Sequence, residues 1–392
     1  MQTAFKITNY FQKWLLGLLV LGLMWVLFAF AIHTALLDNT LGADFATFWI
    51  GSRAALLEGK TPYSAEVTSV SQQLIYHRPA LPEEDQLAFA YPLPAVFLLL
   101  PVAWMSLDWA QAFWLALNIL ALLSVLFFLF PKTPGYLRFT YLLFYPVVFG
   151  LILGNFAILI SVFILIFLQG LFLNKSRPTI WVQLIAGICL AFCIIKPQFA
   201  WVYLLLAVLM ALRQRLWPFF TALAGTAIIL MAGSLILVPD WPLQWFKRVS
   251  EYAAYVKGQP ALTILLGHIS PTGLLSPLAA GITLLVFILS LWLIYRWWTG
   301  HLASISLVIW AGFVTYLFHP HGISYEQITF ILPFTLWVLN TQKNRISGKL
   351  LWFFAIILSW LLFFLTFWHV SPIAVNEFPF LFYIAWMIYW VY

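Results

Sequence analysis

The feature that most constrains this chain is its division into long apolar runs separated by short polar loops. Hydrophobic residues make up 64% of the sequence and charged residues 8%, whereas a soluble domain carries about 25% charged residues. A helix that crosses a bilayer needs about 20 largely apolar residues, and helices and closed barrels are the structures that satisfy their backbone hydrogen bonds in lipid. The sequence therefore predicts an all-α polytopic membrane protein.

Twelve apolar segments are candidate spans, and several of them have only about 15 residues, a length that suits tilted or broken helices around a cavity. The candidates are 14–36, 109–130, 139–153, 156–173, 179–195, 198–212, 217–238, 273–295, 302–318, 325–340, 350–368 and 378–392. The proline-containing segment 91–107 is interpreted instead as lying in the outer interface, because a span there would invert every later loop.

Charge predicts the sidedness. With the N-terminus in the cytoplasm, the short inner loops hold twelve of the 19 basic residues, as the positive-inside rule expects. All 12 Asp and Glu residues then lie on the outer side. We expect one transmembrane domain over 1–392 in the plasma (inner) membrane, with both termini cytoplasmic and two long outer loops, 37–108 and 239–272.

Several function classes lack their sequence signals. The chain has no phosphate-binding GxxxxGK[ST], no dinucleotide-binding GxGxxG and no zinc-binding HExxH. Basic residues do not cluster with aromatic residues as in a nucleic-acid surface, so no nucleic-acid partner is expected. Any activated donor would have to come from the membrane.

The first outer loop carries one candidate catalytic acid, Asp44. Apolar residues recur at helical spacing from Asp44 to Leu57, and Gly59 ends the run, a pattern that predicts a short amphipathic helix on the outer membrane face. Asp is among the best N-cap residues, so a capping role and a catalytic role are both open.

The turns between later spans carry further candidates on the same side. Lys196 is the basic residue of an outer turn, where topology disfavours it, and an anionic ligand such as phosphate would explain it. His319 and His321 flank Pro320, and Glu326 stands at the entrance of the next span. The alternative for Lys196 is a side chain that extends to the headgroup layer. The alternatives for the histidines and for Glu326 are an interfacial turn and a favourable contact with the helix dipole. Lys247, Arg248, Lys257 and His268 of the second outer loop are interpreted as solvated residues or contacts of lipid headgroups.

Taken in order, these motifs resemble glycosyltransferase family 87 over roughly residues 40–335. The matching motifs are Asp44…Gly59-x-x-Pro62-Tyr63, Tyr91-Pro92-Leu93-Pro94, Gly154-Asn155, Lys196-Pro197-Gln198, Pro320-His321 and Tyr325-Glu326. Glu326 stands where the family more often has Asp, and Gly267-His268-Ile269-Ser270 matches a Gly-Asn-x-Ser turn loosely.

The resemblance implies a GT-C-like fold and an inverting enzyme that moves a sugar, most often mannose, from a polyprenyl-phosphate donor to a hydroxyl on a glycolipid or glycan acceptor. It implies that Asp44 is the catalytic base. The donor phosphate and sugar are expected to contact Lys196, His321, Arg53, Tyr325, Glu326, Asn155 and His268. No cofactor and no metal are expected, because a monophosphate leaving group needs less charge neutralisation than a diphosphate.

Two other activities stay open at this point. A transporter or flippase of lipid-linked sugars would also suit broken helices, but it would place ionisable groups near the bilayer midplane rather than at the span ends. A ligase or polymerase of surface polysaccharide would use diphosphate donors, and Lys247, Arg248 and Lys257 keep that alternative open.

Overall fold

The computed structural model describes residues 2–36, 42–131, 133–173, 176–255, 260–267, 275–319, 324–338 and 345–368, and throughout these ranges the regular elements are helices. The candidate spans begin with α1 (Gln2–Leu36), α4 (Leu107–Leu129), α5 (Gly135–Thr140) with η2 (Tyr141–Leu143), α6 (Tyr145–Leu153), α7 (Ala157–Phe167) with η3 (Leu168–Leu173), and α8 (Ile180–Cys193). They continue with α9 (Pro197–Gln214), α10 (Trp217–Leu237), α13 (Leu275–Trp298), α14 (Ser304–Leu317), α15 (Ile328–Trp337) and α16 (Ile346–Phe367).

Eleven of the twelve apolar segments expected from sequence coincide with these helices, and the twelfth, 378–392, lies outside the described residues. The expected count of about twelve spans is not confirmed. Six described helices are long and apolar enough to cross a bilayer, or seven if the bent pair 135–153 is one span. The 14-residue α14 is about 21 Å long, which is shorter than the hydrocarbon core of about 30 Å. The protein is therefore a multi-pass membrane protein with several helices too short to span alone.

Prolines and glycines produce the breaks. Pro146 and Pro197 each lie in the first turn of a helix. Backbone N–H groups there have no hydrogen-bond partner within the helix, so a proline, which has no N–H, breaks no bond. The axis bends by 61° between η2 and α6. Gly187 allows a close helix contact, because a Cβ there would lie 2.4 Å from the carbonyl oxygen of Phe219 in α10. Small residues serve this purpose in membrane proteins, where packing rather than hydrophobicity drives helix association.

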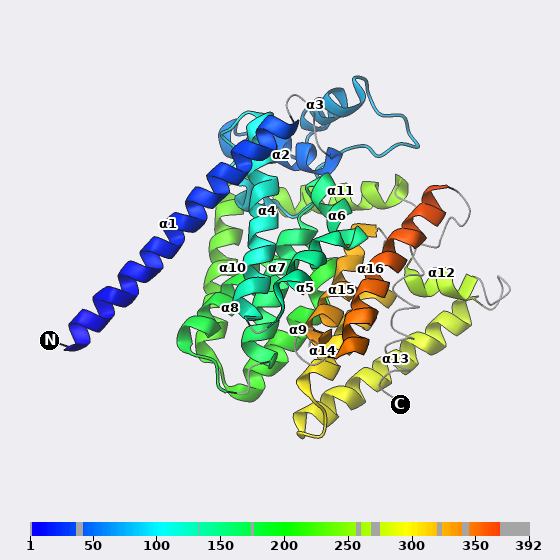
Figure 1. Cartoon of the computed structure of the whole chain (residues 1–392). Coiled ribbons are helices and arrows are strands. Elements are labelled where there is room, and N and C mark those ends of the chain that lie inside the picture. The colour runs from blue at the N-terminus through cyan, green and yellow to red at the C-terminus, as the bar shows by residue number, and fades with distance from the viewer. Residues whose placement is uncertain are drawn as a thin grey trace.

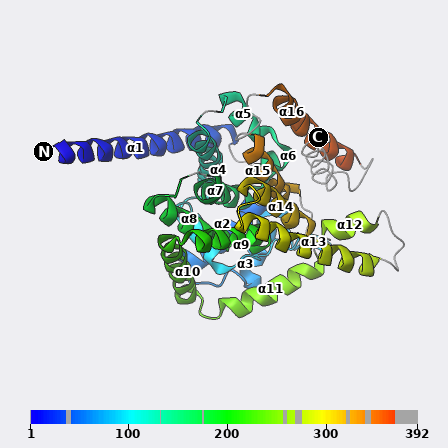
Figure 2. The ribbon, with the colours of Figure 1, turned by 90° about the horizontal axis from the view of Figure 1, so that it is seen from below.

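The two long loops between spans carry helices of their own, and the helices of the first loop and the longer helix of the second lie towards one end of the bundle (Figure 1). The first contains α2 (Ala43–Leu57), α3 (Ala65–Tyr76) and η1 (Leu93–Leu99), and the second contains α11 (Trp241–Tyr255) and α12 (Ala261–Gly267). Helix α1 packs on α4 and extends away from the remaining helices (Figures 1 and 2).

Two expectations for the first loop need correction. The helix expected after Asp44 forms, but α2 does not present its apolar face to lipid, because residues on nearly every side of it are buried against α3, α4 and η1. Segment 91–107 is not an interface segment throughout either, because only part of it is exposed, including Leu100 at 44% and Trp104 at 70%. Its short helix η1 is buried between α2, α10 and α11, with Leu93 and Val96 fully covered by protein.

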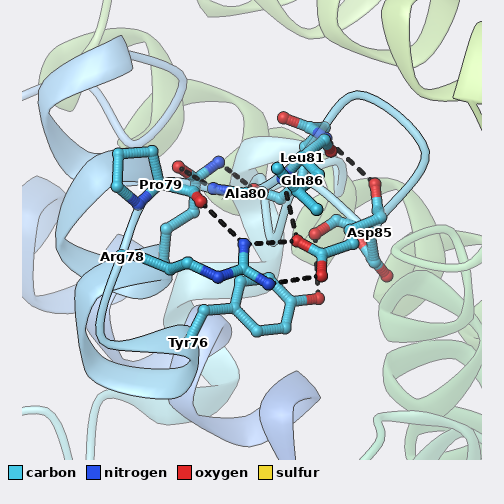
Figure 3. A network of polar contacts seen from close by, with 9 residues as sticks. Tyr76, Arg78, Pro79, Ala80, Leu81, Asp85 and Gln86 are labelled. Carbon is cyan, nitrogen blue, oxygen red and sulfur yellow. Dashed lines mark hydrogen bonds and ion pairs between the residues drawn. The ribbon is translucent and has the colours of Figure 1, made fainter.

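Between α3 and η1 the chain forms a compact polar loop (Figure 3). The guanidinium of Arg78 donates two hydrogen bonds of 2.7 and 2.8 Å to the carboxylate of Glu84, which also accepts one from the backbone N–H of Leu81. The Arg78 contacts hold the pKa of Glu84 down at about 2. The Tyr76 hydroxyl donates to the backbone carbonyl of Asp85. This folded loop sets the path of the chain into Tyr91.

Candidate active site

Asp44 lies in the first turn of α2 and not at its N-cap. The N-cap residue is Gly42, and a Cβ at that position would lie 2.2 Å from the Cα of Leu153 at the end of α6. The expected capping role of Asp44 is therefore wrong, and its carboxylate is available for a contact outside its own helix. An acid in the first turn still interacts favourably with the helix dipole.

The turn between α6 and α7 brings Asn155 to this carboxylate. Gly154 ends α6 in the left-handed conformation, with a φ of 66°, and the N–H groups of Gly154 and Asn155 donate to the carbonyls of Leu151 and Gly150. This is the Schellman arrangement that a glycine favours. A Cβ on Gly154 would lie 2.6 Å from the Cβ of Phe45, so the glycine also lets α2 pack closely on the turn.

The Asn155 side chain joins three elements. Its Nδ2 donates to Asp44 Oδ2 at 2.7 Å, and its Oδ1 accepts from the N–H of Ala157 at 2.9 Å. The same Oδ1 accepts from Lys196 Nζ at 3.1 Å. Because the oxygen is held by two donors, the amide group is oriented with its N–H groups towards the carboxylate.

Lys196 is a buried cation at the N-cap of α9, with 1% of its side chain exposed. Its Nζ lies 2.7 Å from Oε1 of Glu326, which is 6% exposed. His319 Nε2 lies 2.9 Å from the other oxygen of that carboxylate. A buried charge requires such partners, since an unpaired charge in a nonpolar interior is costly.

Aromatic rings surround the ammonium. Nζ lies 4.8 Å from the ring centroid of Tyr325, 5.7 Å from that of Phe199 and 6.0 Å from that of Tyr91. The rings exclude water and contribute cation–π attraction. Tyr91 belongs to one of the sequence motifs but is not among the site residues expected from sequence. Its position directly before Pro92 is the signal that could have pointed to it.

Contacts therefore run in an unbroken series from Asp44 through Asn155, Lys196 and Glu326 to His319. Four regions that are far apart in sequence contribute to it, since His319 and Glu326 come from the same region. Asp44 is the partly exposed member, and the other four are buried. Loss of water around the carboxylate raises the pKa of Asp44 from 3.8 to about 6, although the Asn155 hydrogen bond and the Lys196 charge oppose that rise. An acid with this pKa is a suitable general base near neutral pH.

The other expected site residues fall into two groups. Arg53 lies near the C-terminal end of α2, where its guanidinium donates to the carbonyl of Ala103 at 3.2 Å, lies 3.8 Å from Glu58 and stacks over Trp49. It is not part of the series that starts at Asp44. His321 and His268 lie outside the described residues. Their roles, like the chemical roles of all the site residues, stay predictions.

Among the residues that the structure describes, no group of three or more His, Cys, Asp and Glu side chains is arranged to hold a metal ion. Metal independence stays a prediction.

Buried charged residues on the broken helices of a membrane bundle are typical of a functional site in a membrane-embedded protein. The chain belongs to glycosyltransferase family 87, whose family model matches residues 89–320, and it is a glycosyltransferase. The matched region contains Asn155, Lys196 and His319. Comparison with curated proteins and with solved structures gives no match.

Proposed function

We propose that the protein is an inverting glycosyltransferase that takes a sugar, with mannose as the first choice, from a polyprenyl-phosphate donor and moves it to a hydroxyl of a glycolipid or glycan. Family membership supports sugar transfer over the transporter alternative. The observation that carries the proposed mechanism is the contact series that links Asp44, through Asn155, to Lys196. A carboxylate and an ammonium group bridged by one amide side chain support a proposal that pairs a base with a cation.

In the proposed reaction Asp44 accepts the proton of the acceptor hydroxyl while the hydroxyl oxygen attacks the anomeric carbon. The bond from that carbon to the phosphate oxygen breaks, and polyprenyl phosphate leaves with the electron pair. A single displacement inverts the anomeric centre. A positioned base of this kind accelerates a reaction by about 10²–10⁴-fold.

Lys196 is the proposed partner of the leaving phosphate. An ammonium group has three N–H donors, and in the described part of the chain Asn155 and Glu326 receive two of them. Because the side chain is buried, donor binding has to displace part of its aromatic cover, and Tyr91 and Tyr325 are the rings in position to move. Cation stabilisation of a developing charge is stronger in such a water-poor site.

We further propose that the active site faces the outer side of the plasma (inner) membrane, with both termini in the cytoplasm. The basic inner loops support this orientation.

The test compares wild type, Asp44→Asn and Glu66→Gln with polyprenyl-phosphate-mannose, a panel of acceptors and a chelator. Glu66 is a matched control, since it is an exposed first-turn acid of α3 in the same loop. We expect Asp44→Asn to lower kcat by about 100-fold or more and Glu66→Gln to leave it unchanged. The raised pKa of Asp44 means that its ionised form is disfavoured in the folded state, so Asp44→Asn should fold normally at pH 7.

Full activity of Asp44→Asn would show that another group is the base. Activity with a polyprenyl-diphosphate sugar and none with the monophosphate would replace the proposed donor class with that of a polysaccharide ligase or polymerase.

A further inference from the structure

Helix α11 has two different faces. The residues at helical spacing from Trp241 through Trp245 and Tyr252 are buried or half-buried. The opposite face is exposed, and it presents Leu243 at 77% and Phe246 at 67% exposure. Large apolar side chains with this exposure need a nonpolar environment, because water contact with them is unfavourable.

The inner face of α11 is fastened to the first outer loop. The Gln244 side chain accepts a hydrogen bond from the hydroxyl of Thr61, Trp245 Nε1 donates to the carbonyl of Ala90 at 3.1 Å, and the Arg248 guanidinium donates to the carbonyl of Tyr63. These contacts fix the rotation of the helix about its axis. Because these contacts hold the inner face of α11 against the protein, the apolar outer face is directed away from it.

The position of α11 and its continuity with α10 indicate what covers the outer face of α11. In Figure 1 α11 lies level with the ends of the spans and across their direction, and in Figure 2 it runs along the edge of the molecule from α10. Helix α10 is a candidate span, and its Ile228, Ile229 and Ile236 are exposed as residues in contact with lipid would be. Three residues separate the end of α10 from the start of α11, so the two apolar surfaces adjoin.

Charge on the outer face fits the same environment. Lys247 directly follows Phe246 and its side chain is exposed, so a four-carbon stem and an ammonium group stand at the edge of the apolar face. Long lysine side chains extend along an apolar surface in this way to reach the headgroup layer. Helices that lie in the interface bury an apolar face about 5–10 Å into the boundary between headgroups and acyl chains.

We propose that α11 is an interfacial helix whose outer face binds the lipid bilayer, with Leu243 and Phe246 among the upper acyl chains and Lys247 at the level of the lipid phosphates. Because its inner face holds Thr61, Tyr63 and Ala90, this helix connects the bilayer surface to the chain segment that carries Tyr91 into the site. The proposal concerns binding to lipid and does not depend on the identity of the sugar donor.

The experiment places an environment-sensitive fluorophore on single cysteines at Leu243, Phe246 and Lys247, in a chain whose buried Cys189 and Cys193 are replaced by alanine. The full-length protein is reconstituted in vesicles of phosphatidylcholine and phosphatidylglycerol. Two reference positions calibrate the signal: Ile236 on the lipid-exposed surface of α10, and Glu83 in the exposed polar loop. Quenching is measured with lipids spin-labelled at the headgroup or on the acyl chain, and with iodide in water.

We expect labels at Leu243 and Phe246 to match the blue-shifted emission and acyl-chain quenching of the Ile236 label. The label at Lys247 should be quenched more by the headgroup probe than by the acyl-chain probe. Emission and iodide quenching equal to those of the Glu83 label would overturn the proposal, because the face would then lie in water. Protection from both lipid and iodide would also overturn it, since a protein would then cover the face. Leu243 and Phe246 are labelled separately, so each tests the proposal alone.

Discussion

Asn155 Nδ2 and Asp44 Oδ2 lie 2.7 Å apart although 111 residues separate them in the chain. The contact exists because Gly42 and Gly154 let the first turn of α2 meet the turn between α6 and α7 at backbone distance. Since Asn155 also accepts a hydrogen bond from Lys196, the ionisation of the proposed base depends on the packing of three separate helices.

Acceptor-dependent transfer should depend on pH through Asp44. A base acts in its ionised form, so with a pKa of about 6 kcat/KM should fall about tenfold per pH unit below that value and level off above it. Asn155→Leu removes a hydrogen bond that lowers the pKa of Asp44, and should move the acid limb upward by about one to two pH units, since a hydrogen bond to a charged group contributes about 1.5–3 kcal/mol. Pre-steady-state rates over pH 5–8 measure this. An unshifted limb in Asn155→Leu would remove Asn155 from control of the base.

The Lys196 and Glu326 side chains should be interdependent for stability. Lys196→Met removes the ammonium partner of the buried Glu326 carboxylate, leaving its contact with His319, and should lower the free energy of unfolding by about 3–5 kcal/mol. The double variant Lys196→Met with Glu326→Gln should recover part of that loss, because the buried carboxylate charge is gone. Thermal unfolding in detergent micelles measures both variants. The exposed Lys60–Glu66 pair gives the control, for which Lys60→Met should cause no measurable change. Additive effects of the two substitutions would show that the pair is not coupled.

Gly154→Ala should damage both stability and transfer. Its φ of 66° costs an L-residue about 1–2 kcal/mol, and the new Cβ would lie 2.6 Å from the Cβ of Phe45. Gly300→Ala is the matched control, since Gly300 has a φ of 85° with nothing within 4 Å of a new Cβ. The excess loss in Gly154→Ala over Gly300→Ala in unfolding experiments measures the contact with α2. Equal losses and unchanged transfer would mean that α2 adjusts without moving Asp44.

The orientation in the membrane should be visible by chemical labelling. A cysteine replacing Glu83 should react with a membrane-impermeant maleimide in intact cells, because the first long loop is proposed to lie outside. A cysteine replacing the exposed Arg177 should react after the membrane is permeabilised. Both native cysteines are buried, which keeps the background low. The reverse pattern of reactivity would place the site on the cytoplasmic side.

The sequence alone determined the class of protein and the order of its functional residues. An apolar run long enough to enter a bilayer is a local property of the sequence, so it predicts a helix without knowledge of the rest of the fold. The described helices lie where those runs predicted them. Pro197 and Gly154 likewise act through their own backbone geometry, and they lie at the boundaries between expected spans. The break at Pro146 falls inside the segment 139–153, which was expected to be one span. Short motifs then indicated Asp44, Asn155, Lys196 and Glu326 as members of one site.

Tertiary structure decided how these residues are used. Pairing of Lys196 with Glu326, and the position of Asp44 beside Asn155 rather than at a helix cap, depend on packing between segments far apart in the chain. The burial of η1 has the same origin, because an apolar segment can be covered equally by lipid or by protein. Sequence periodicity reports which face of a helix is apolar, but the partner that covers that face is selected by the fold as a whole.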